Sequence, residues 1–170
     1  LIDRIKDSAK QKGTGRWASI EALKQGVDIS MITSACTARI MSNHLDEREK
    51  AWQLIHSPAV GLSPDKESFA AMVREALYTG KIIAYAQGFS LMQDASRLYG
   101  WNLDLGKIAS IFRAGCIIQA VFLNDITHAF EAEPKPESLI FDGFFLSRIN
   151  EHQDSLRQAV STGVMNGLPI

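Results

Sequence analysis

Residues 11–17, with the sequence QKGTGRW, combine two cations and a hydroxyl with two glycines. The glycines predict a flexible loop that leads into a helix, and the first main-chain N–H groups of a helix have no helical partner. Such groups beside Lys12, Thr14 and Arg16 suit an anion such as phosphate. The alternative is an ordinary turn between helices with solvated cations, and the spacing matches neither the phosphate-loop nor the dinucleotide-binding fingerprint.

Arg39 is a second candidate for anion binding. At 100° per residue, it falls within the apolar stripe of a predicted helix, which consists of Ile29, Ile32, Ala35, Cys36 and Ile40. An arginine that faces a core needs an ion-pair partner, an outward path for its guanidinium, or a ligand anion. A structural ion pair with a nearby acid and a ligand contact therefore both remain open.

The other chemically reactive side chains form no recognisable site. The histidines lack metal-ligand spacing relative to one another or to Cys36 and Cys116, so we expect surface or capping histidines and no metal. The two cysteines sit among apolar neighbours and predict buried small side chains rather than a disulfide framework. No catalytic nucleophile, base and orienting acid can be assembled from the sequence. The four histidines are His44, His56, His128 and His152.

Composition excludes several classes of protein. The chain has 170 residues and a formal net charge of −1, whereas a general nucleic-acid binder carries a basic excess. No apolar run approaches the roughly 18 residues that a membrane span needs. Two cysteines that predict no disulfide favour a reducing, cytoplasmic setting. We therefore expect neither a nucleic-acid partner nor a membrane partner.

Helical periodicity recurs along the chain, and strict alternation is not found. Ser63-Pro64-Asp65 is typical of a helix start, and no breaker follows before Gly100, which predicts one helix over residues 64–99. Its apolar middle, residues 76–92, indicates burial, with Gly80 and Gly88 accepting the close approach of a neighbouring helix. The sequence thus predicts an all-α fold, a multi-helix bundle around a long central helix. The other predicted helices are 17–25, 30–43 (capped by Ser30), 46–56, 104–114 (capped by Asp104), 116–130 and 142–160, with a turn at 134–136.

Several segments, taken in order, resemble the 6-phosphogluconate dehydrogenase family. Lys10 and Gln119 depart from the family pattern, which usually has glycine or alanine at the first position and arginine at the second. Since the separate motifs occur in the family's order, chance similarity is very improbable. The matching segments are residues 5–17 (IKDSAKQKGTGRW), 35–42 (ACTARIMS), 81–89 (KIIAYAQGF), 99–103 (YGWNL) and 111–118 (IFRAGCII).

The resemblance implies that residues 1–170 are the all-helical C-terminal domain, cut from a protein with an N-terminal Rossmann domain and a C-terminal tail. Leu1 in place of methionine, and an end without a polar tail, agree with two cuts. The implied reaction is the NADP-dependent oxidative decarboxylation of 6-phosphogluconate to ribulose 5-phosphate, in the pentose phosphate pathway, by a homodimer.

The resemblance also implies roles for individual residues. Lys12 and Thr14 would contact the sugar phosphate, and Arg39 would clamp its phosphate group. The cofactor site, the lysine base and the glutamate acid of the family would lie upstream. The chain alone would then supply substrate contacts and dimer scaffold, without activity.

Two other interpretations compete with this one. The first is a free-standing helical module for dimerisation or interaction that shares the family's helices. The second is a fragment of a short-form dehydrogenase that uses NAD, because the group that meets the ribose 2′ position decides between NAD and NADP. A G-x-G-x-x-G segment upstream of Leu1 would exclude the module.

Overall fold

The computed structural model describes residues 2–56 and 65–168, and within these ranges the regular elements are all helices. The all-α prediction is therefore confirmed for the described residues. Two short 3₁₀ helices, η1 (Ile2–Arg4) and η2 (Leu139–Phe141), accompany the α-helices. The α-helices are α1 (Thr14–Gln25), α2 (Ser30–Ser42), α3 (Leu45–Leu54), α4 (Lys66–Tyr99), α5 (Leu105–Ile111), α6 (Leu123–Glu131) and α7 (Gly143–Met165).

The central helix α4 has 34 residues, which corresponds to a length of about 51 Å. It begins at Asp65, whose carboxylate accepts hydrogen bonds from the main-chain N–H groups of Glu67 and Ser68 at 3.2 and 2.9 Å. The capping residue is thus Asp65 and not the predicted Ser63, which lies with Pro64 outside the described residues. The helix ends at Gly100, whose φ of 67° is left-handed, as the glycine predicts.

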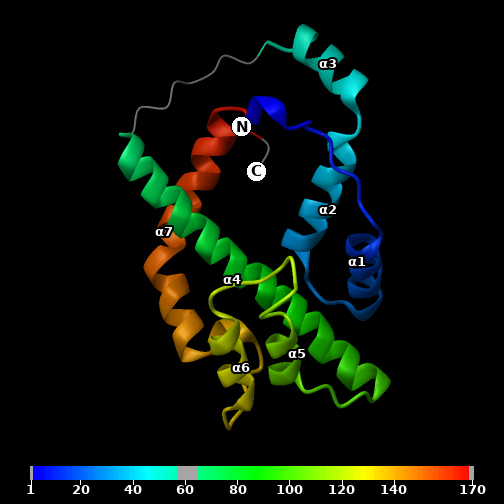
Figure 1. The fold of residues 1–170 in the computed structure, drawn as a ribbon, viewed down its shortest axis with the longest axis vertical. Helices are drawn as coiled ribbons and strands as arrows, with labels where there is room; N and C mark the ends of the chain where they lie inside the picture. Colours follow the sequence, from blue (N-terminus) through cyan, green and yellow to red (C-terminus); the bar gives the residue numbers. More distant parts are fainter. Residues whose placement is uncertain (1, 57–64, 169–170) are drawn as a thin grey trace.

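Most of the other helices pack against α4 (Figure 1). Helix α7 crosses its N-terminal half, α1 and α2 contact it further along, and α5 and α6 pack together beside its C-terminal half. Helix α3 lies away from α4, beyond the end of α2. Between α4 and α7, Ser155 donates a hydrogen bond of 2.6 Å to Glu75. The rings of His152 and Tyr78 pack edge-to-face, with their centroids 5.9 Å apart. Residues far apart in the sequence thus complete the bundle.

The hydrophobic core lies between α4, α5, α6 and the start of α7. Phe122 is at its centre and makes edge-to-face contacts with Tyr78, Tyr85 and Phe145, with ring centroids 5.4 to 5.8 Å apart. Such aromatic contacts add to the stabilisation from the buried area itself. The buried core residues are Ile82, Ala86, Phe89, Leu105, Ala109, Phe122, Leu123, Ile126, Ala129, Phe130, Leu139 and Phe145.

The two glycines inside α4 face α2, as predicted. A Cβ atom added at Gly80 would lie 3.5 Å from the methyl carbon of Met31, and one at Gly88 would lie 3.9 Å from Cδ1 of Ile32. Both distances correspond to ordinary van der Waals contact. A methyl group would therefore fit at both positions, so the contact of α2 with α4 does not require glycine there.

The predicted helix over residues 116–130 is wrong in its first half. Gly115 has a φ of 66°, residues 116–122 form turns, and α6 starts only at Leu123. Ile117 and Val121 are almost fully exposed, at 101% and 97%. The run is apolar on every side, so it lacks the periodicity that separates a helix from a turn.

Several other predicted helix boundaries also differ: α1 starts at Thr14 rather than at residue 17, and α5 ends at Ile111 rather than at residue 114. Ser30 is the first residue of α2 rather than its cap, and its main-chain N–H donates to the carboxylate of Asp28 at 2.8 Å. Helix α7 continues to Met165 rather than ending at residue 160, and it passes through Gly163, which is buried. A buried position tolerates glycine when close packing compensates its low helix propensity.

Candidate anion-binding site

The loop before α1 has the conformation that its glycines predict. Gly13 precedes the first helical residue with a φ of 107°, and a Cβ atom there would lie 3.3 Å from the ring of Trp17. Within the described residues, no side chain caps this end of α1, so its first N–H groups keep their hydrogen-bonding capacity. The side chains of Lys12 and Thr14 are exposed on either side of Gly13. A cation, a hydroxyl and free N–H groups therefore converge at one helix start.

Residues 7–12, here called the strap, run beside α2 without forming a helix or strand (Figure 1). The main-chain N–H of Ala9 donates to Oγ of Ser42 at 2.9 Å, and Nδ2 of Asn43 donates to the carbonyl oxygen of Ala9 at 2.9 Å. The hydroxyl of Ser8 donates to Oδ1 of Asn43 at 2.8 Å. Further along, the thiol of Cys36 contacts Oε1 of Gln11 at 3.6 Å. The strap is therefore fixed to α2 by its main chain as well as by side chains.

Arg39 contributes to the same arrangement from α2. Its Nη2 donates to the carbonyl oxygen of Lys10 at 2.6 Å, and among the described residues it makes no ion pair. The structural salt bridge considered for this arginine is therefore not found there. A guanidinium has five N–H donors, so most of them stay available to a ligand.

Arg39 does not face the core, although it falls within the apolar stripe of the sequence. Every residue of α2 is half-buried or exposed in the structure, and Arg39 itself is exposed. Of the apolar stripe, Ile29 is buried, whereas Ile40 at the other end is 46% exposed. The stripe faces the core only where α2 approaches α4, and beyond that point it faces the strap.

Arg48 on α3 also belongs to the site, and sequence reasoning missed it. Its Nη2 pairs with the carboxylate of Asp7 at 2.6 Å, and its Nη1 donates to the carbonyl oxygens of Asp7 and Ser42, each at 3.1 Å. One side chain thus joins the start of the strap to the end of α2. These partners lie up to 41 positions apart in the sequence, and no local spacing indicates them.

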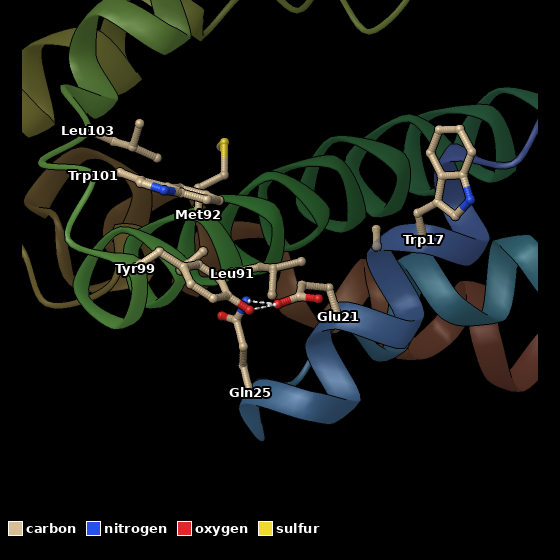
Figure 2. Close-up of a pocket in the computed structure, with 10 residues that line it drawn as sticks. Trp17, Glu21, Gln25, Leu91, Met92, Tyr99, Trp101 and Leu103 are labelled. Atoms are coloured by element: carbon tan, nitrogen blue, oxygen red, sulfur yellow. Dashed lines mark hydrogen bonds between the residues drawn. The ribbon is translucent and has the colours of Figure 1, made fainter.

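A second concave surface lies between α1 and the C-terminal end of α4, with a volume of about 500 Å³ (Figure 2). Oη of Tyr99 donates to the carboxylate of Glu21 at 2.5 Å, and Nε2 of Gln25 donates to the same oxygen at 2.9 Å. The bond from Tyr99 lowers the pKa of the Glu21 carboxyl and raises the pKa of the Tyr99 phenol. The Tyr99 ring stacks on Trp101 with centroids 4.9 Å apart. The predicted residues Lys12, Thr14 and Arg39 are not among those that line this pocket.

The described residues contain neither a cluster of potential metal ligands nor a parallel sheet. In residues 2–56 and 65–168, no three His, Cys, Asp or Glu side chains gather as metal ligands. Dinucleotides ordinarily bind at the edge of a parallel sheet, and these ranges contain no strand. None of the described helices is long and apolar enough to cross a membrane.

Comparisons with known proteins agree on one family. A family model described as "6-phosphogluconate dehydrogenase, C-terminal domain" matches residues 1–170. The decarboxylating 6-phosphogluconate dehydrogenase of Mus musculus is 46% identical over 171 residues, covering 100% of this chain and 35% of that protein. The enzyme of Staphylococcus aureus (strain N315) is 44% identical over 169 residues, covering 99% and 36%.

A solved structure shows the same fold. The 6-phosphogluconate dehydrogenase of Plasmodium falciparum superimposes with a TM-score of 0.92 at 37% identity, covering 100% of this chain and 37% of that one. These likenesses define the class, a helical domain of the kind found at the C-terminal end of 6-phosphogluconate dehydrogenases. The chain belongs to the family of 6-phosphogluconate dehydrogenase C-terminal domains. It spans about a third of the length of the curated relatives it matches.

Proposed function

We propose that this chain forms part of the binding site for 6-phosphogluconate in an NADP-dependent enzyme that oxidises and decarboxylates it to ribulose 5-phosphate. The family supports this proposal, as does the Plasmodium falciparum relative, described in complex with its cofactor NADP⁺ and with its substrate 6-phosphogluconate. The observation that carries it is the contact of Arg39 with the strap. It brings a guanidinium to the main chain two residues before Lys12.

Three residues have distinct tasks in this proposal. The guanidinium of Arg39 grips two phosphate oxygens with parallel hydrogen bonds, whereas the ammonium of Lys12 supplies a compact charge. Thr14 adds a hydroxyl beside the free N–H groups at the start of α1, where the helix dipole also favours an anion. A phosphate bound there would meet donors from both sides of Gly13.

The chemical step is assigned to other parts of the enzyme. The lysine base and glutamate acid that the family implies are proposed to lie outside residues 1–170, and NADP is proposed to bind on a nucleotide-binding domain. General acid–base catalysis requires groups within hydrogen-bond reach of the substrate. The 170-residue chain alone is therefore proposed to bind the phosphate end without turning the substrate over.

An activity assay on the complete enzyme tests this proposal. We expect NADPH formation with 6-phosphogluconate, and almost none with unphosphorylated gluconate, because the phosphate contacts would be lost. Reduction of NAD in place of NADP would instead favour the short-form dehydrogenase. An enzyme that accepts gluconate equally well would contradict the phosphate role of this site.

We also propose that the enzyme works as a homodimer in the cytoplasm. The chain exposes several large apolar side chains, among them Trp52 at 82%, and such surface commonly marks protein–protein contacts. Light scattering of the complete enzyme tests the dimer, and a strict monomer at high concentration would contradict it. The proposed cytoplasmic location rests on Cys36 and Cys116, which are free thiols in the structure. The distribution of a fluorescent fusion protein in cells tests it.

A further inference from the structure

The strap and α2 contact each other in antiparallel order. Ser8 and Ala9 reach Asn43 and Ser42 at the end of α2, and Lys10 reaches Arg39 one turn earlier. Gln11 then reaches Cys36, a further turn back. Successive residues of the strap thus contact positions of α2 that lie progressively closer to the N-terminus of the helix. The position of the loop after the strap follows from this register.

The side chain of Asn43 bonds both the strap and α2, as does the hydroxyl of Ser42, which accepts the N–H of Ala9 and donates to the carbonyl oxygen of Arg39 at 2.8 Å. Its Nδ2 donates to the carbonyl oxygen of Ala9 and to the carbonyl oxygen of Arg39, each at 2.9 Å. Its Oδ1 accepts the hydroxyl of Ser8 at 2.8 Å. One amide group therefore joins the main chain that leads to Lys12 and the main chain that carries Arg39.

We propose that Asn43 is a positioning residue, which sets the distance between Lys12 and Arg39 without touching the substrate. The inference rests on the proposed phosphate role of these two cations. The strap has no helical or sheet hydrogen bonds of its own, so its place depends on its contacts with α2 and, at Asp7, on Arg48 of α3. Binding groups work only when their supports hold them closely, and a shift of about 1 Å can cost a large part of their effect.

Steady-state kinetics of the complete enzyme test the proposal. Asn43→Ala removes two of the hydrogen bonds to the strap, those with Ser8 and Ala9, and we expect the KM for 6-phosphogluconate to rise about three- to tenfold. The turnover number and the KM for NADP should change less than about twofold, because neither depends on the phosphate contacts. Thr37→Ala is the matched control. Its hydroxyl bonds only the carbonyl oxygens of Thr33 and Ser34 within α2, so its kinetics should stay unchanged.

A double-mutant cycle separates positioning from general stability. If Asn43 acts through the phosphate contacts, Asn43→Ala should raise the KM by a further factor of less than about two in the Arg39→Ala enzyme. An equal rise in both backgrounds would show a merely structural role and overturn the proposal. Should Asn43→Ala fail to fold, Ser8→Ala decides. It removes one bond of the set and should raise the same KM by a smaller factor, and an unchanged value would overturn the proposal.

The cycle also separates the phosphate role of Arg39 from the positioning role of Asn43. An Arg39→Ala enzyme with an unchanged KM would remove the proposed phosphate role itself. A raised KM in Arg39→Ala beside an unchanged KM in a folded Asn43→Ala would remove only the inference about Asn43.

Discussion

Arg39 on α2 donates a hydrogen bond of 2.6 Å to the main-chain carbonyl oxygen of Lys10. An exposed arginine normally samples many rotamers, and fixing them on binding costs free energy. This contact restricts the guanidinium before any ligand arrives, and it leaves other N–H groups unused. The arginine is therefore preorganised beside the loop that carries Lys12 and Thr14.

Removing that guanidinium should weaken substrate binding. Hydrogen bonds to charged groups contribute about 1.5–3 kcal/mol, which is about a tenfold to hundredfold effect. In the complete enzyme, Arg39→Ala should raise the KM for 6-phosphogluconate at least about tenfold, with a smaller change in turnover. Arg39→Lys should recover only part of the loss, because lysine lacks the planar fork.

The cofactor provides the control for this variant. The KM for NADP should hardly change, since the cofactor is proposed to bind on another domain. An unchanged KM for 6-phosphogluconate in a folded Arg39→Ala enzyme would mean that Arg39 only anchors the strap.

The conformation of Gly13 predicts a cost for any side chain there. Gly13→Ala must hold a left-handed residue, at about 1–2 kcal/mol, and must also displace the Trp17 ring, which is 3.3 Å from the new Cβ. Gly26→Ala has the same kind of backbone cost, with φ at 72°, but meets no atom within 4 Å. Chemical denaturation should therefore show a larger loss for Gly13→Ala, and equal losses would refute the contribution of Trp17.

Neighbouring phenylalanines at the start of α7 should differ sharply in their effect on stability. Phe145 is fully buried against Phe122, and Phe145→Ala should lower the free energy of unfolding by about 3–5 kcal/mol. Phe144 is 38% exposed, so Phe144→Ala should cost clearly less. Urea unfolding measures both, and similar losses would contradict the position of the core.

The cap of α4 makes stability depend on pH. The hydrogen bond from the Ser68 hydroxyl, followed by the N–H groups of Ser68 and Glu67, lowers the pKa of Asp65 below its ordinary value of 3.8. Because the folded pKa is the lower one, the carboxylate stabilises the fold above pH 3.8, and this contribution is lost as the pH falls through the folded value. Asp65→Asn should therefore lower the Tm at neutral pH, by an amount that shrinks below pH 3.8. A difference that is the same at every pH would contradict the charge effect.

The sequence predicted helices correctly where a capping residue marks the start and a helix-breaking residue marks the end. Asp104 caps α5 by accepting the N–H of Lys107 at 3.0 Å, as its position before an apolar stretch suggests. The turns at 116–122 were missed because an apolar run has the same composition in either conformation.

The site was predictable only in part. Lys12 and Thr14 could be identified from the glycine loop around them. The supporting contacts of Asn43 and Arg48 join positions 34 and 41 residues apart, and only the folded chain brings these residues together.

The packing of α7 on α4 has a consequence for synthesis of the chain. The hydrogen bond between Glu75 and Ser155 closes a loop of 80 residues, and such long-range contacts form late. A chain emerging from the ribosome has completed α4 long before α7 exists, so the side of α4 that packs on α7 spends that interval uncovered. Nascent chains of this domain should therefore need a chaperone until α7 has emerged.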